Sequence, residues 1–306
     1  MVTARFTAAY GRVRSNYFVR NLVDIFQNTL SDRITKVAFA FFIAVVLMGA
    51  FGPQIAPYNP SETQYSDSGD ILRTQPPSID HPMGTDRLGR DIFSMVLVGA
   101  QPTMLLVVVV GTMILTIGSV VGVTAGYVGG LVDEVLMRFT DFIYSVPLLP
   151  AALVLVVILE SGFWTTAFII GALIWRGMAR VLRSQVLQVK ERPFVMAAKS
   201  TGASTPRILL KHIFPNVAPM AILFTAIGAG YAVIIQAGLA FLGLADPSSY
   251  TWGIILRNAY QSGVIVDAWW WALFPGLLIS FTVLSLFLIG RGYEDDDVAE
   301  DMMASA

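Results

Sequence analysis

Long, nearly uncharged apolar segments recur along this chain and constrain its fold more than any other feature. A helix needs about 20 mainly apolar residues to cross the hydrocarbon core of a bilayer. Only 13% of the residues are charged, about half the share that a soluble domain carries. We therefore expect an all-α integral membrane protein with six transmembrane helices. The expected spans are residues 37–57, 103–128, 139–160, 163–182, 215–243 and 269–290.

Lys and Arg residues are distributed unequally about these spans. All but four of the 20 fall on one side, the exceptions being Arg73, Arg87, Arg90 and Arg257. Because loops rich in Lys and Arg stay in the cytoplasm, we expect both termini there. The expected parts are a cytoplasmic segment 1–36, a membrane domain 37–293 and an acidic cytoplasmic tail 294–306. Within the membrane domain we expect extracellular loops 58–102 and 244–268 and a cytoplasmic loop 183–214.

Several kinds of chemistry are excluded by residues that the sequence lacks. There is no Cys, so disulfides, thiolate metal sites and cysteine nucleophiles are ruled out. His81 and His212 are too few and too far apart to suggest a metal site, and no nucleic-acid-binding pattern is present. No Gly-Lys dipeptide occurs, so the chain lacks the phosphate-binding loop it would need to hydrolyse ATP. The acids lie mostly in loops or at the ends, which disfavours a proton-driven carrier.

Two local patterns suggest helix packing and membrane anchoring. Gly118, Gly122 and Gly126 give repeated small-xxx-small spacings, which favour close approach by a helix of a partner or of the same chain. Three Trp residues at 269–271 are expected to anchor the sixth span at the outer interface. In the loop 81–101, Thr85 or Asp86 is expected to cap a surface helix.

The stretch 193–216 predicts two short helices on the cytoplasmic face. Pro193 suits the first turn of a helix, and Gly202 suits a left-handed cap at its end. Thr205 as N-cap with Pro206 would start the next helix, and Pro215 would mark the bend into the membrane. Lys199, Arg207 and Lys211 are then placed to meet a polar surface. From residue types alone, this surface is either anionic lipid or a soluble partner protein.

The sequence "MAAKSTGASTPRILLKHIFPN" (196–216) resembles the "EAA" loop of permease subunits from binding-protein-dependent ABC importers. Ala197, Ala198, Gly202 and Pro215 match that motif, and Met196 stands where Glu often occurs. "HPMGTDRLGRDIFSMVLVGAQ" (81–101) and "VDEVLMRFTDFIYSVPLLPAALVL" (132–155) resemble the C-type permease of dipeptide, oligopeptide and nickel importers. The likeness covers about residues 34–292. Gln236 departs from it, because the family commonly has Glu there.

This resemblance implies a type I ABC importer permease fold and a set of partners. These would be a B-type permease, two cytoplasmic ATPase subunits, an extracytoplasmic binding protein and membrane lipid, with no nucleic acid. No cofactor is expected in this chain, because the ATPases would bind ATP and Mg²⁺. The residues expected to couple to an ATPase are Met196, Ala197, Ala198, Lys199, Gly202, Ala203 and Ser204. Gln236, Arg138 and Asp141 are the expected pathway or gating residues, although Arg138 and Asp141 could simply pair with each other.

The implied function is ATP-driven import of di- or oligopeptides across a prokaryotic plasma membrane, by a subunit that is not itself an enzyme. Relatives in this family also carry nickel chelates or oligosaccharides, and the sequence does not separate these substrates. A channel or secondary carrier without an ATPase is the alternative of another class. A simple membrane anchor fits less well, because it gives no role to the two short helices predicted over 193–216.

Overall fold

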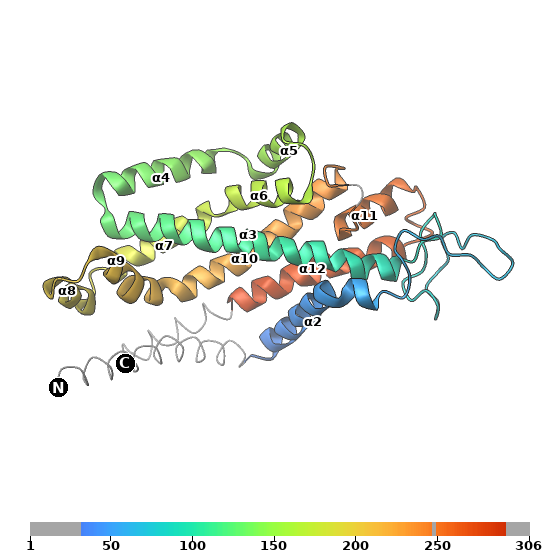
Figure 1. Ribbon diagram of the computed structural model, residues 1–306, viewed down its shortest axis with the longest axis horizontal. Coiled ribbons are helices and arrows are strands. Elements are labelled where there is room, and N and C mark those ends of the chain that lie inside the picture. Colours follow the sequence, from blue (N-terminus) through green and yellow to red (C-terminus); the bar gives the residue numbers. More distant parts are fainter. Residues whose placement is uncertain (1–31, 247–248, 292–306) are drawn as a thin grey trace.

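The computed structural model describes residues 32–246 and 249–291, and confirms an all-α membrane protein over these ranges (Figure 1). Five helical segments are long and apolar enough to cross a membrane, and a sixth span is obtained if a bent helix pair is counted as one. The five segments are α2 (Arg33–Ile55), α3 (Ile92–Val128), α6–α7 (Phe163–Val189), α9–α10 (Thr205–Phe241) and α12 (Trp270–Arg291). The expected N-terminal segment, except its last residues, and the acidic tail lie outside the described residues.

The helix of the second span begins earlier than expected, within the predicted loop 58–102. α3 starts at Ile92, with Asp91 as its N-cap, and Pro102 lies inside the helix. Residues of this first part, including Met95, Val96 and Ala100, are buried against Trp252 and Trp271. This apolar packing explains why the helix extends beyond the predicted membrane boundary.

The third span is broken, whereas the sequence predicted one helix over 139–160. α4 (Gly130–Ser145) and α5 (Leu148–Ile158) meet at an angle of 84°. Pro147 causes the break, because a residue before proline avoids the helical conformation and Val146 is extended there. The chain therefore turns sharply between α4 and α5, as Figure 1 shows.

The helix of the fourth span is longer than predicted and extends into the loop expected at 183–214. α6 (Phe163–Ile174) continues almost directly into α7 (Arg176–Val189). The helices α8 (Pro193–Ser200) and α9 (Thr205–Ile208) follow, and a π-helical turn, Leu209–Ile213, leads into α10 (Phe214–Phe241). The predicted fifth and sixth spans agree with α10 and α12. The loop between them contains an additional helix, α11 (Trp252–Gln261).

α3 lies at the centre of the bundle and contacts α2, α6, α7 and α10. Gly118, Gly122 and Gly126 of α3 pack against α7. Of the two alternatives that the spacing allowed, the neighbouring helix is therefore one of the same chain and not of a partner. A Cβ atom at Gly122 would lie 2.5 Å from the carbonyl oxygen of Ala179, and one at Gly126 would lie 2.8 Å from that of Arg183. The missing side chains therefore allow the two helices to pack backbone against backbone.

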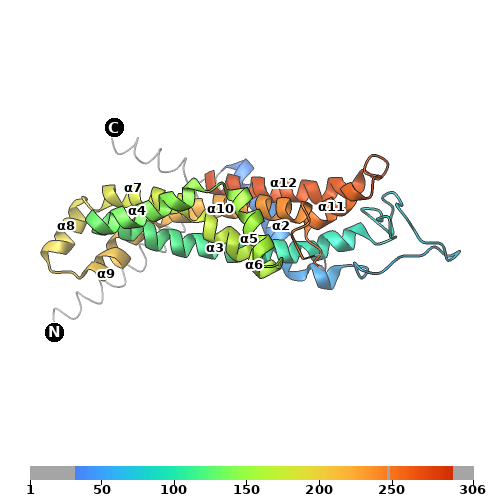
Figure 2. The same cartoon turned by 90° about the horizontal axis from the view of Figure 1, so that it is seen from above.

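The Trp triplet at the start of α12 is divided between surface and core. Trp269 is half exposed and suits the predicted anchoring role, but Trp270 and Trp271 are buried in the cluster beneath α11 and the start of α3. Anchoring is thus the wrong interpretation for these two residues. Their burial is explained by α11 and the loop before α3, which lie at the same end of the bundle (Figure 2).

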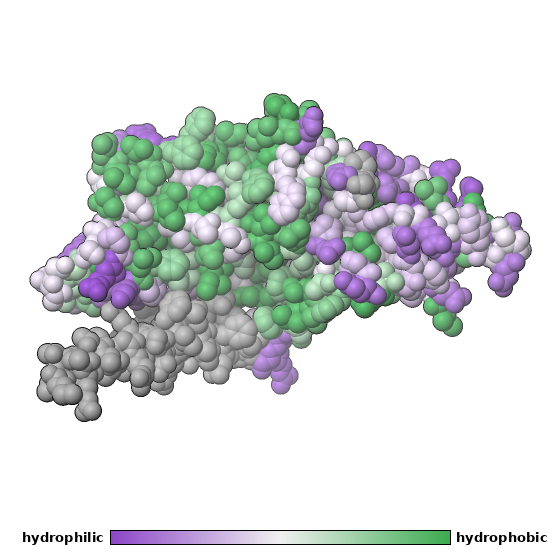
Figure 3. All heavy atoms as spheres, viewed as in Figure 1, coloured by the Kyte–Doolittle hydropathy of each residue, from purple (hydrophilic) through white to green (hydrophobic). Residues whose placement is uncertain are grey.

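Hydrophilic residues gather at the two ends of the molecule, and the face over α4, α5 and α6 is largely hydrophobic (Figure 3). One end is formed by the loop between α2 and α3, and the opposite end by α8 and α9 (Figure 1). This separation is what a bilayer around the middle of the bundle requires.

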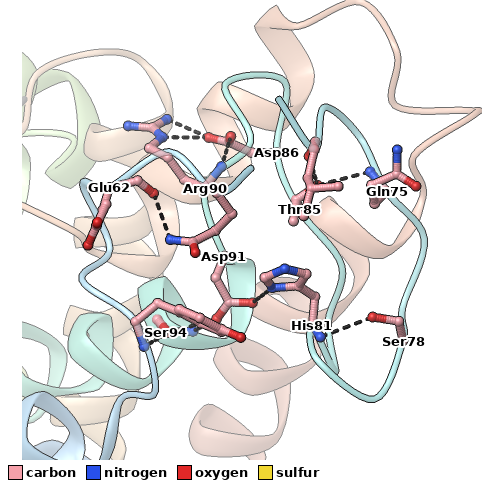
Figure 4. A network of polar contacts seen from close by, with 12 residues as sticks. Glu62, Gln75, Ser78, His81, Thr85, Asp86, Arg90, Asp91 and Ser94 are labelled. Atoms are coloured by element: carbon pink, nitrogen blue, oxygen red, sulfur yellow. Dashed lines mark hydrogen bonds and ion pairs between the residues drawn. The ribbon is translucent and has the colours of Figure 1, made fainter. Parts of the chain in front are cut away.

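The loop between α2 and α3 is fixed by buried polar contacts rather than by an apolar core (Figure 4). Asp91 accepts hydrogen bonds from the Ser94 N–H and hydroxyl, both at 2.7 Å, and its other oxygen lies 2.9 Å from His81 Nδ1. Asp86 accepts the N–H groups of Leu88 and Arg90 and pairs with the Arg90 side chain. Neither Thr85 nor Asp86 caps a helix, so that prediction is wrong; Asp91 is the cap.

Replacing Asp91 with Ala is expected to lower the free energy of unfolding by about 2–3 kcal/mol, from the lost helix cap and the buried groups left without a partner. The melting temperature in detergent measures this effect. Asp80→Ala, at an exposed position of the same loop, is the control and is expected to change little. Equal melting temperatures for the two variants would show that the loop is not held through Asp91.

Candidate functional site

α8 lies at the end of the bundle opposite the loop between α2 and α3 (Figures 1 and 2). It follows α7 after a short turn, in which Lys190 donates from its ammonium group to the carbonyl of Gly126 at 3.0 Å. α8 is therefore joined to the most extensive helix contact of the bundle, the one between α3 and α7. A force applied to α8 would act directly on a membrane-spanning helix.

The local fold of α8 follows the predicted pattern at both of its ends. Pro193 is the first helical residue, where its missing N–H needs no partner. Gly202 has a φ of +78°, and its N–H donates to Lys199 while the N–H of Ala203 donates to Ala198. These two bonds form a Schellman motif, which confirms the predicted glycine cap.

The start of the next helix differs by one residue from the prediction. Ser204 is the N-cap, and Thr205 and Pro206 are the first two helical residues. Pro215 does not introduce the bend, because the chain is helical from Thr205 to Phe241. The irregularity lies before it, in the π-helical turn Leu209–Ile213.

One side of α8 is buried in the core of the protein. Val195 is completely buried and Ala198 is 9% exposed, and both belong to a cluster that includes Val186, Ile208 and Ile213. Ala203 is half-buried against the same cluster. Among the predicted coupling residues, Ala198 therefore packs α8 against the core of the protein and is not part of its exposed surface.

The opposite side of α8 is exposed and partly apolar. Of the residues predicted to couple to an ATPase, Met196 and Ala197 are exposed on α8, and Gly202 and Ser204 are exposed in the turn that follows it. Met196 is 48% exposed, and two residues that the motif did not identify are exposed as well: Phe194 of α8 at 42% and Leu210 of the π-helical turn at 70%. A period of three between the buried Val195 and Ala198 was the available signal for the buried side, and it leaves Met196 and Ala197 on the outer side. Exposed apolar residues around a small-residue corner are typical of a docking surface.

The basic residues of this region have different roles. The Lys199 ammonium lies 5.2 Å from the centre of the Tyr127 ring, so it contacts the end of α3 through a cation–π interaction. Arg207 and Lys211 are exposed, as expected for residues that meet a polar surface.

The predicted pathway residues are not brought together as one group. Arg138 and Asp141 do not pair with each other: Arg138 lies 3.9 Å from Glu134 at an exposed position, and Asp141 lies 2.5 Å from Arg180 on α7. Gln236 is buried within α10, close in sequence to the buried Ile235 and Leu239. Charged residues of α4 thus pair with charged residues of α7. Among the described residues, Gln236 forms no hydrogen bond with any of them.

Comparison with known proteins identifies the family of this chain. Residues 118–294 match the family described as binding-protein-dependent transport system inner membrane component, over more than half of the chain. The chain belongs to this family. Residues 22–77 also match the N-terminal transmembrane domain of oligopeptide transport permease C. The protein is thus a transport permease in a membrane, and a system of this kind includes further ABC importer components.

Three relatives illustrate the extent of this likeness. The oligopeptide transport system permease protein OppC of Bacillus subtilis (strain 168) is 32% identical over 87% of this chain and 85% of its own length. The dipeptide transport system permease protein DppC of the same strain is 29% identical, over 89% and 83%. The probable D,D-dipeptide transport system permease protein DdpC of Escherichia coli (strain K12) is 33% identical, over 86% of both chains.

Proposed function

We propose that this permease forms half of the translocation pathway for di- and oligopeptides in an ATP-driven importer. The names of the relatives support the peptide substrate. The observation that carries the ATP-driven mechanism is α8, a short helix rigidly supported from within and apolar on its outer side. In this proposal α8 is the coupling helix, and it occupies a cleft in a cytoplasmic ATPase.

The proposed assembly contains this chain, a B-type permease, two ATPase subunits and an extracytoplasmic binding protein. Both termini and α8 lie in the cytoplasm of a prokaryotic cell, and the loop between α2 and α3 lies outside. ATP and Mg²⁺ bind to the ATPases, and this chain contributes no catalytic group and holds no cofactor. The absence of a Gly-Lys dipeptide supports this division of labour.

Of the predicted coupling residues, Met196, Ala197, Gly202 and Ser204 form the proposed contact, joined by Phe194 and Leu210. Ala198 and Ala203 support the helix, and Lys199 fixes it to α3. When the ATPases close on ATP, they displace α8, and the spans switch between inward-open and outward-open arrangements.

The experiment that tests this assembly is purification of the detergent-solubilised chain from its native membrane, with mass spectrometry of the proteins that accompany it. We expect two ATPases, a second permease and a binding protein, with peptides as the ligands that accompany the binding protein. A nickel chelate or an oligosaccharide in the binding protein would overturn the peptide substrate alone. A chain that is purified without any ATPase would contradict the whole proposal.

A further inference from the structure

Three arginines on α7 point to a connection between this helix and the broken third span. Arg176, Arg180 and Arg183 follow one another at intervals of four and three residues, so they share one side of the helix. Arg176 is the middle residue of the spanning segment Phe163–Val189. Charged residues within a membrane-spanning segment are costly unless partners or water surround them.

Two of these arginines form ion pairs with α4. Arg183 makes a two-pronged pair with Asp133, with nitrogen–oxygen distances of 2.5 and 2.6 Å. Arg180 lies 2.5 Å from Asp141, and its guanidinium is 4.0 Å from the centre of the Tyr144 ring. These pairs join the first and the third turns of α4 to α7.

The third arginine binds the end of α4, where the break leaves carbonyl groups without helical partners. Arg176 donates to the carbonyl of Ile143, and also to that of Val146 at 3.4 Å. It lies 4.5 Å from the Tyr144 ring as well. A cation at this end of a helix also offsets the partial negative charge of the helix dipole.

Apolar packing contributes little to holding α4 in place. Of the residues of α4, all of which the structure describes, just Thr140 is buried. Phe139 stacks on Trp175 with 6.3 Å between the ring centres. By contrast, α7 is packed closely against α3 through Gly118, Gly122 and Gly126. The arginine contacts are therefore a main part of the connection between α4 and α7, whereas α4 also contacts α3.

We propose that Arg176, Arg180 and Arg183 are positioning residues that make α4 move together with α7, so that a displacement of α8 reaches the broken third span. This inference rests on the proposed function, because it takes α8 as the point where an ATPase acts. α7 leads into α8 through a turn of only a few residues, and Lys190 ties that turn to α3. The polar contacts replace the apolar packing that elsewhere in the bundle joins neighbouring helices.

The chain contains no cysteine, so a cysteine pair introduced between α4 and α7 can be cross-linked without side reactions within this chain. The variant Asp133→Cys/Arg183→Cys removes the strongest pair, and a short bifunctional methanethiosulfonate reagent can join the two thiols reversibly. The complete importer, in liposomes, is assayed for peptide transported per ATP hydrolysed. Without the reagent we expect this ratio to fall about fivefold. Cross-linking is expected to restore it, and reduction to lower it again.

The pair Leu131→Cys/Val135→Cys is the matched control, because both residues lie on α4, four positions apart, and are exposed. It is expected to transport normally with and without the reagent. The charge exchange Asp133→Arg/Arg183→Asp tests the same connection without any reagent. Because it keeps an ion pair between α4 and α7, its transport per ATP is expected to remain near that of the parent.

Three results would overturn the inference. A normal ratio without the reagent would mean that the pair is not needed, and inhibition by the cross-link would mean that α4 must separate from α7 in each cycle. If neither the cysteine variant nor the charge exchange assembles although the parent does, the arginines serve folding only. A parent chain that shows no ATP-dependent uptake would instead refute the proposed function, so the two failures are distinguishable.

Discussion

Replacing Gly202 with Asp is expected to reduce substrate-stimulated ATP hydrolysis and peptide uptake by more than about tenfold while the chain remains in the membrane. Gly202 has a φ of +78°, a conformation that costs a residue with a side chain about 1–2 kcal/mol. The residue is exposed, and no described atom of the chain lies within 4 Å of the position a Cβ would take. The added carboxylate would therefore project into the surface that receives the ATPase. The measurement is ATP hydrolysis and uptake by the reconstituted importer.

Gly263→Asp provides the control for this experiment. Gly263 has a φ of +73° and likewise no described atom within 4 Å of its Cβ position, but it lies in the turn after α11, away from α8. The backbone strain is thus similar, and only the location differs. We expect this variant to keep its activity. Normal substrate-stimulated hydrolysis in Gly202→Asp, or equal losses in the two variants, would show that α8 is not the coupling surface.

Replacing Gly122 with Ala is expected to destabilise the protein by about 1–3 kcal/mol through overpacking. The new Cβ would lie 2.5 Å from the carbonyl oxygen of Ala179 and 2.9 Å from the Cβ of Leu182. Since the first of these is a backbone atom, α3 and α7 must separate to accommodate it. The melting temperature of the purified protein in detergent is the measurement.

Gly111→Ala is the matched variant, because Gly111 is also a buried glycine of α3. Its Cβ would meet only the Thr225 methyl group, at 3.5 Å, which is an ordinary contact. Its melting temperature is expected to stay near that of the parent. A similar loss in both variants would indicate that glycine in α3 matters for the helix itself and not for its contact with α7.

The approximate positions of the five candidate spans could be predicted from the sequence, because apolar length is a property of each segment alone, whereas the sixth is obtained only if the bent pair α4 and α5 is counted as one span. The ends were harder to predict. Asp91 begins α3 within the predicted loop 58–102, where packing against Trp252 extends the helix beyond the apolar stretch that the sequence indicated. Pro147 was visible in the sequence, but its effect depends on whether neighbouring groups satisfy the carbonyls that a break exposes, and Arg176 does so from a distant part of the chain.

The partners of the charged residues could not be predicted from spacing along one helix. Arg138 and Asp141 are three residues apart, yet Asp141 pairs with Arg180, which lies 39 residues away. Such pairings depend on which helices become neighbours. The two ends of α8 were predicted more accurately, since Pro193 and Gly202 determine the backbone there by their own conformational preferences.

The most direct test of the account is uptake of a labelled peptide by liposomes that contain this chain with its partner permease and both ATPases. We predict uptake that requires ATP, Mg²⁺ and the binding protein together, and that stops when any of them is omitted. Uptake by the chain alone without nucleotide would contradict the account, and α8 would then be a helix on the membrane surface of a channel or secondary carrier.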